Sequence, residues 1–144
     1  MDVIVNVPPL ALINELDTIT LNYTGAALTG SDEFCVWSSS GAYGITISSL
    51  NGDATDPFRA ISATDSLAYT VVFDDSTDPA TGVAVTEGTP ILGQDSTPEN
   101  GFPIGCSAGA TNAVVQVNFV DAGNLAGADA GVYTDEMTLL VSPE

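Results

Sequence analysis

The sequence lacks histidine and lysine altogether, and Arg59 is its only basic residue against 19 acidic ones. Without histidine there is no Ser-His-Asp or Cys-His catalytic group and no imidazole ligand for a metal. Without lysine there is no Schiff base, no P-loop lysine and no isopeptide crosslink between lysine and asparagine. The enzyme chemistry that this composition leaves open is carboxylate-based, such as glycoside hydrolysis by two acids.

Basic charge is scarce enough to exclude two classes of partner. The net charge is −18 over 144 residues, so the chain cannot neutralise the phosphates of a nucleic acid. Anionic membrane surfaces are disfavoured for the same reason, and no apolar run approaches the ~20 residues of a membrane-spanning helix. We therefore expect no nucleic-acid partner and no membrane insertion. Mutual repulsion suits a saline or extracellular setting, where salt shortens its range to ~8 Å.

Cysteine is also scarce, since Cys35 and Cys106 are the only two. Their spacing fits neither a zinc site nor a thioredoxin-like motif. We predict a disulfide between them rather than two buried thiols, and hence an oxidising compartment. Subtraction of the residue numbers gives a loop of 71 residues, and closing such a loop is worth about 4 kcal/mol in the chain-entropy model. No signal peptide is visible, because a strand-like run follows Met1 and Asp2 at once, which indicates a mature or trimmed chain.

Apolar and polar residues alternate along most of the chain, and no stretch shows helical spacing over three turns. The alternation predicts strands at 17–23, 34–37, 43–49, 58–61, 67–73, 113–120 and 132–141, with short edge candidates at 82–86 and 89–92. The segments at 34–37 and 43–49 should form a hairpin. Loops are expected at 24–32 and 93–109, and one helical turn within 121–131. About eight short strands between turn signals predict an all-β fold, an immunoglobulin-like β-sandwich, rather than a barrel with evenly spaced hairpins.

The two ends of the chain suggest an exchange of strands between copies. Residues 2–7 form an apolar strand-like run, and Pro8 and Pro9 interrupt it. At the other end, the final strand carries Tyr133, Met137, Leu139 and Val141 on one face. If that strand has no neighbour on one side, the N-terminal segment of another copy can pair there by strand addition. The contacts would come from Val3, Val5, Val7, Leu10 and Leu12. The simpler interpretation is that residues 2–13 are the first strand of their own sheet.

Two segments resemble the spore coat protein U domain, a family that includes subunits of archaic chaperone-usher pili. The first is the run Phe34-Cys-Val-Trp-Ser-Ser-Ser-Gly-Ala-Tyr-Gly-Ile-Thr46, and the second is Ala130-Gly-Val-Tyr-Thr-Asp-Glu-Met-Thr-Leu-Leu-Val-Ser-Pro-Glu144. The segment 111–117 also fits, and the resemblance covers residues 15–144. The closing motif is fairly specific, whereas the other segments are ordinary β-sequence.

The resemblance implies an immunoglobulin-like domain, residues 15–144, that lacks its last strand and is completed by a donor strand. A periplasmic chaperone supplies that strand first, an outer-membrane usher assembles the subunits, and the N-terminal segment of the next subunit then replaces the chaperone. Residues 2–13 would be the donor segment, and residues 132–141 would border the acceptor groove. The implied product is an extracellular fimbria on the cell surface, which serves adhesion and biofilm formation without a cofactor.

One departure concerns the place of the chain within such a filament. Many shaft subunits of the family carry a cysteine near the start of the first domain strand, and residues 16–23 contain none. A pair formed by Cys35 and Cys106 is closer to the tip or minor subunits. The resemblance therefore leaves open whether this chain is the repeating unit.

The acidic residues offer weaker candidates for a site. Asp74, Ser76 and Asp78 have the spacing of a calcium loop, but Pro79 replaces its glycine and Val85 its final glutamate. Such a segment is more typical of a solvated loop tip, as is the turn that contains Asp53 and Asp56. We therefore predict no metal site.

Three further residue patterns have structural or chance explanations. Asp135 falls on the same strand face as Tyr133, where a charge needs hydrogen bonds, and a catalytic role is the minor alternative. Trp37 alternates with Cys35 and is expected in the core beside the disulfide rather than on a sugar-binding surface. The run Asn22-Tyr-Thr24 matches a glycosylation acceptor, a motif that is common by chance.

Three functional hypotheses follow from these patterns. The first is a fimbrial subunit, not an enzyme, that assembles noncovalently with neighbouring subunits. The second is a self-contained secreted β-sandwich that binds carbohydrate or a surface through its loops. The third is a carboxylate hydrolase, which requires a concave cleft with one acid of raised pKa.

Overall fold

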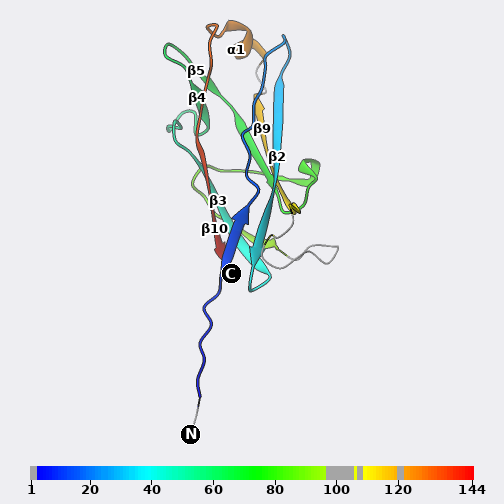
Figure 1. Cartoon of the computed structure of the whole chain (residues 1–144). Coiled ribbons are helices and arrows are strands. Elements are labelled where there is room, and N and C mark those ends of the chain that lie inside the picture. The colour runs from blue at the N-terminus through cyan, green and yellow to red at the C-terminus, as the bar shows by residue number, and fades with distance from the viewer. Residues whose placement is uncertain (1–2, 97–105, 107–108, 120–121) are drawn as a thin grey trace.

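Two antiparallel sheets face each other in the computed structural model, which describes residues 3–96, 106, 109–119 and 122–144 (Figure 1). The larger sheet has the order β1 (Ala11–Asn14), β2 (Leu28–Ser38), β9 (Ala113–Phe119), β6 (Thr70–Asp74) and β7 (Val83–Ala84). The smaller has the order β10 (Met137–Pro143), β3 (Ala42–Ser49) and β8 (Ile91–Asp95). A ribbon of β4 (Arg59–Ile61) and β5 (Ser66–Ala68), the turn η1 (Pro79–Thr81) and the helix α1 (Ala122–Gly127) complete the described elements. The prediction of an all-β sandwich is confirmed.

The core lies between the two sheets and is built from alternate residues of their central strands. The larger sheet contributes side chains of β2, β6 and β9, and the smaller sheet contributes those of β3. These buried side chains include Phe34, Val36, Tyr43, Ile45, Ile47, Val71, Phe73, Val115 and Val117. Because successive side chains of a strand point to opposite faces, this alternation could be read from the sequence.

The predicted hairpin of 34–37 with 43–49 is wrong. The two segments lie in β2 and β3, which belong to different sheets and are joined by a tight turn with a positive φ at Gly41. The reason is that both edges of β2 are already paired, one with β1 and the other with β9. Likewise, β3 pairs with β10 on one side and β8 on the other. The turn therefore crosses from one layer of the sandwich to the other.

Several predicted boundaries also differ from the structure. Residues 17–23 are not a hydrogen-bonded strand, and β2 begins at Leu28, inside the predicted loop at 24–32. The strand predicted at 67–73 is divided at Tyr69 into β5 and β6, which lie in separate sheets. The predicted helical turn is confirmed as α1, whereas most of the predicted loop at 93–109 lies outside the described residues.

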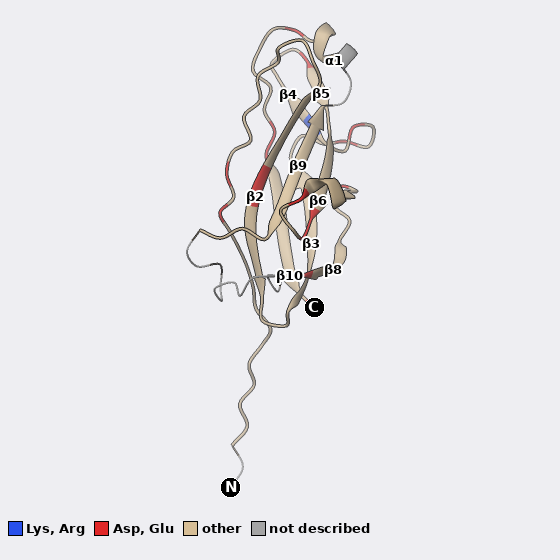
Figure 2. Ribbon diagram, turned by 90° about the vertical axis from the view of Figure 1, so that its right-hand side faces the viewer, with Lys and Arg blue, Asp and Glu red and all other residues tan. Residues whose placement is uncertain are grey.

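Acidic residues are spread over the folded domain, and one basic position interrupts them (Figure 2). That base is Arg59, whose Nη1 lies 2.5 Å from Asp53 Oδ2, and its Nε donates a hydrogen bond to the carbonyl of Asn51 at 2.9 Å. Asp53 also accepts hydrogen bonds from the backbone N–H groups of Thr55 and Asp56. These backbone bonds and the nearby guanidinium hold the pKa of Asp53 below its usual range. Within the described ranges, no helix is long and apolar enough to cross a membrane.

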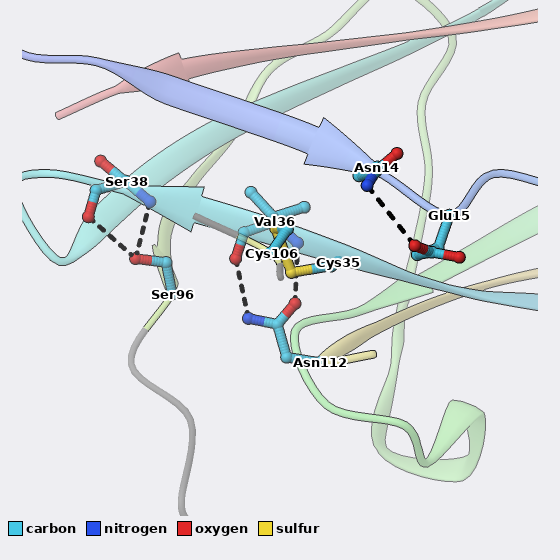
Figure 3. Close-up of a disulfide and its surroundings, with 8 residues drawn as sticks. All are labelled: Asn14, Glu15, Cys35, Val36, Ser38, Ser96, Cys106 and Asn112. Atoms are coloured by element: carbon cyan, nitrogen blue, oxygen red, sulfur yellow. Dashed lines mark hydrogen bonds between the residues drawn. A yellow bond between two sulfur atoms is a disulfide. The ribbon is translucent and has the colours of Figure 1, made fainter. Parts of the chain in front are cut away.

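The predicted disulfide joins Cys35 on β2 to Cys106 (Figure 3). The expected position of Trp37 is wrong, because the core side chains of this strand are Phe34 and Val36. Alternation places Cys35 and Trp37 on the other face of β2, where Trp37 is half-buried and Leu12 of β1 is its cross-strand partner. The disulfide therefore lies on the outer face of the larger sheet and does not cross the core between the two sheets.

Candidate functional site

The N-terminal segment extends away from the sandwich as an isolated chain (Figure 1). Its apolar side chains are largely exposed, at 77% for Val3, 90% for Ile4, 78% for Val5 and 77% for Val7. A run of exposed branched side chains is unusual on a folded surface, because burying each one would contribute roughly 1.5–3 kcal/mol. The segment is therefore a candidate for binding to another surface.

The exposed segment is anchored to the domain at Leu10. The N–H of Leu10 donates to Ser39 Oγ at 2.9 Å, and the carbonyl of Leu10 accepts from the N–H of Ser39 at 2.9 Å. From Ala11 to Asn14 the chain is strand β1, which pairs with β2 of the same chain. Of the predicted donor residues, Val3, Val5 and Val7 are thus free, Leu10 is at the anchor, and Leu12 belongs to the domain in this single chain.

A groove of about 1020 Å³ opens in the side of the sandwich. One wall is the segment 16–23. The other is the segment 128–136 together with Met137 and Leu139 of β10. Its floor is apolar and comes from both the larger sheet and the β4–β5 ribbon. The floor side chains are those of Leu28, Ala60, Leu67, Tyr69, Val115, Val117 and Phe119.

The first wall, residues 16–23, is held to the domain by side chains. In the described part of the chain, no backbone–backbone hydrogen bond involves these residues, and the N–H of Asp17 donates a hydrogen bond to Asp32 Oδ2 at 2.9 Å. Ile19 and Leu21 pack down onto Gly30 of β2, where an added Cβ would lie 2.7 Å from each of them. The absence of a side chain at Gly30 therefore lets this wall lie close to the sheet, with its backbone edge unpaired.

The second wall is the edge strand β10 and the chain that leads into it. Within the described residues, β10 has β3 as its one hydrogen-bonded neighbour; β1 lies near its other edge without pairing to it. Before β10, Thr134 forms a bridge with Ile61 of β4 through two backbone hydrogen bonds. Both walls of the groove thus present backbone groups that no strand of this chain pairs.

The predicted acceptor residues are mostly brought together in this groove. Tyr133, Met137 and Leu139 line it. Val141 shares the inward, half-buried face of β10 but lies beyond the lining residues. The opposite wall, residues 16–23, was not predicted, because its alternating apolar and polar residues are also typical of a paired strand.

Asp135 lies in the wall of the groove and accepts four hydrogen bonds. Its Oδ2 accepts from Ser49 Oγ at 2.6 Å and from Tyr69 Oη at 2.5 Å. Its Oδ1 accepts from the N–H of Asn51 at 3.1 Å and from Asn51 Nδ2 at 3.0 Å. Burial, followed by this hydrogen bond and the charge of Asp135, raises the pKa of Tyr69, so the phenol remains a donor. The carboxylate has the hydrogen-bond partners that its position requires, as expected.

The acidic loops are organised by hydrogen bonds of their own. Asp74 accepts hydrogen bonds from Ser76 and Thr81, and Asp78 caps η1 by accepting from the N–H of Ala80 at 3.0 Å. Among residues 3–96, 106, 109–119 and 122–144, no group of three or more Cys, Asp or Glu side chains is arranged to hold a metal ion. The carboxylates of this loop thus serve its local conformation.

Comparison with known proteins finds a similar fold among solved structures. No protein-family model matches the sequence, and no curated protein matches it. Among solved structures, the chain is similar to one from a chaperone–tip adhesin complex involved in the biogenesis of CFA/I fimbriae. The identity is 17% and the TM-score is 0.59, over 93% of this chain and 41% of the other. The likeness shows a shared β-sandwich fold, and this chain spans less than half the length of its neighbour.

Proposed function

We propose that this protein is a structural subunit of an extracellular fimbria, assembled noncovalently when the N-terminal segment of one copy fills the groove of the next. The observation that carries the proposal is the groove itself, in which an apolar floor lies between two unpaired backbone edges. An occupant that satisfies both edges must be an extended chain, since a strand offers N–H and C=O groups on both of its sides. It must also be apolar on the face that meets the floor.

The exposed segment of the same chain has the required composition. Val3, Val5 and Val7 alternate with Ile4 and Asn6, so one face of the extended segment is wholly apolar. Residues 3–13 contain no charged side chain. That neutrality suits the groove, whose lining includes Asp17, Asp32, Asp129, Asp135 and Glu136 and no basic residue.

The arrangement of the chain favours another copy over the chain's own groove. Leu10 is held by two hydrogen bonds to Ser39. Pro8 and Pro9 precede Leu10, and each proline has a restricted φ and no N–H group. The segment extends away from the sandwich (Figure 1), and a head-to-tail contact of this kind generates an open filament.

The setting of the proposed function follows from the same features. The disulfide suits an oxidising compartment. An unfilled groove with an apolar floor would aggregate during export, so we propose that a periplasmic chaperone covers it and that an outer-membrane usher exchanges the chaperone for the next subunit. The similarity to a chain of a chaperone–tip adhesin complex supports that pathway.

The test is a comparison of two aspartate substitutions that differ by one position. The purified full-length chain is run on a gel with and without boiling, and strand exchange predicts a ladder of multimers that boiling abolishes. Val5→Asp places a charge on the face that meets the groove, so the ladder should disappear. Ile4→Asp places the same charge on the opposite face and should retain the ladder. Both residues are exposed, so neither change should alter folding.

Two results would overturn the proposal. A single monomer band for the unaltered chain in every lane would favour a self-contained binding module. Equal ladders from Val5→Asp and Ile4→Asp would show that the segment does not enter a groove with the alternating contacts of a strand.

A further inference from the structure

We infer that Asp135 is a positioning residue for strand capture, since it holds both the wall and the floor of the groove in the geometry that a donor strand requires. This inference rests on the proposed function. The apolar contacts of the groove would bind the inserted strand, whereas the carboxylate of Asp135 would keep the wall and the floor in place.

The last part of the chain changes sheets at Asp135. Thr134 is bonded to Ile61 of β4, and from Met137 onward the chain pairs with β3, where Met137 is opposite Ser49. Asp135 lies between these two pairings. Its hydrogen bonds to Ser49 and Asn51 attach it to the end of β3 and to the loop that follows, so the point of crossing is set by the carboxylate.

Neighbouring backbone bonds reinforce the same crossing. The N–H of Leu50 donates to the carbonyl of Glu136 at 2.9 Å, and Asn51 Nδ2 also donates to the carbonyl of Thr134 at 3.2 Å. Arg59 donates to the carbonyl of Asn51 and so holds that loop from the other side. The backbone carbonyls of Thr134 and Glu136 thus accept hydrogen bonds from the loop that follows β3.

The second function of Asp135 is to orient the floor. Tyr69 donates to it, and the Tyr69 ring lies 5.1 Å from that of Phe119 and 5.8 Å from that of Phe58. Tyr69, Phe119 and Asp135 all line the groove. A single hydrogen bond therefore connects an aromatic residue of the floor to the wall, and both residues line the groove that an inserted strand would fill.

The experiment measures binding of a capped, fluorescently labelled peptide of residues 3–13 to the full-length chain carrying Val5→Asp, because the altered N-terminal segment leaves the groove of a neighbouring copy unfilled. Asp135→Asn keeps the shape of the side chain but leaves one acceptor oxygen for the four donors that surround it. We expect the peptide to bind about tenfold more weakly, in line with the loss of buried hydrogen bonds to a charged group. Tyr69→Phe keeps the ring and removes only the hydroxyl, and we expect about threefold weaker binding. The double variant should bind more tightly than the product of the two effects predicts, because both changes act on the same hydrogen-bonded pair.

A matched control separates positioning from loss of overall stability. Asn112 bonds to Val36 of β2 and does not line the groove. Asn112→Asp should destabilise the domain while leaving peptide affinity unchanged at a temperature where all variants are folded. If Asp135 merely stabilises the fold, its variant will behave like Asn112→Asp.

The outcomes separate the two proposals. If the Val5→Asp chain with no further change fails to bind the peptide, both the proposed function and the role of Asp135 are wrong. If that chain binds, and the further changes Asp135→Asn and Tyr69→Phe leave binding equally tight, only the role of Asp135 is overturned. Should Asp135→Asn fail to fold, the result for Tyr69→Phe decides, because that change leaves the ring contacts in place.

Discussion

The side-chain amide of Asn112 forms two hydrogen bonds with the backbone of one residue, Val36. Its Oδ1 accepts from the N–H of Val36 at 2.8 Å, and its Nδ2 donates to the carbonyl of Val36 at 2.8 Å (Figure 3). Pairing of β2 with β9 ends at Phe34 and Ala113, so Val36 lies beyond that ladder. The amide of Asn112 thus acts in place of a strand residue and extends the pairing of β2 beside the disulfide.

Asn112→Asp should lower the free energy of unfolding by about 1–3 kcal/mol, because the carbonyl of Val36 loses its donor and faces a carboxylate. Urea unfolding followed by tryptophan fluorescence measures the change, since Trp37 is adjacent on β2. Asn118→Asp is the control, because it adds the same charge to β9 while keeping the oxygen that accepts from Thr29 at 3.1 Å. Equal losses for the two variants would attribute the effect to charge alone.

Removal of the disulfide should cost about 4 kcal/mol, because Cys35 and Cys106 close a loop of 71 residues that would otherwise gain conformational entropy on unfolding. The double variant Cys35→Ser/Cys106→Ser, compared with the unaltered chain by urea unfolding, measures the change. A reducing agent should destabilise the unaltered chain and leave the double variant unaffected. An unchanged unfolding midpoint after reduction would contradict the expectation.

Asp32 and Asp65 should show opposite dependences of stability on pH. Burial, with the charges of Asp17 and Glu33, raises the pKa of Asp32 despite the hydrogen bond from the N–H of Asp17. Hydrogen bonds from the N–H groups of Ser66 and Asp129 lower the pKa of Asp65. A raised folded-state pKa means stability that is lost as the pH rises through it, and a lowered one means stability that is lost as the pH falls through it.

Asp32→Asn should therefore stabilise the domain at pH 7, by less than about 1 kcal/mol for this half-buried group that water still screens. Asp65→Asn should destabilise it at pH 7. Both differences should shrink as the pH falls through the range of an unperturbed aspartate, whose pKa is about 3.9. Thermal unfolding of the two variants between pH 7 and acid conditions measures this, and differences of the same sign would contradict the assignment.

Assembly between copies should depend on salt, whereas binding of the isolated segment should not. Each copy carries a net charge of −18, so multimers should form slowly at low ionic strength and faster near 0.15 M salt, where the screening length is about 8 Å. A capped peptide of residues 3–13 is uncharged, and its affinity for the groove should be nearly constant. Light scattering of the unaltered chain and peptide titration of the Val5→Asp chain over the same salt series test the contrast. Equal salt dependence in both would show that repulsion between subunits does not control assembly.

Much of the local structure followed from the sequence, because it depends on neighbouring residues. The period of two in residues 43–49 and 113–119 fixes which side chains face the core, as β3 and β9 confirm. The same pattern correctly placed Met137, Leu139 and Val141 on the inward face of β10. The pairing of Cys35 with Cys106 followed from there being only two cysteines.

The partners of each strand were decided by the tertiary structure. Hydrogen bonds between strands join residues distant in the chain, and alternation says nothing about which edge meets which. For this reason the sequence wrongly paired 34–37 with 43–49, and it did not show that 16–23 would be an unpaired wall. The carboxylate of Asp135 shows the same limit, since its four donors come from Ser49, Asn51 and Tyr69, which only the packing of the two sheets and the β4–β5 ribbon brings together.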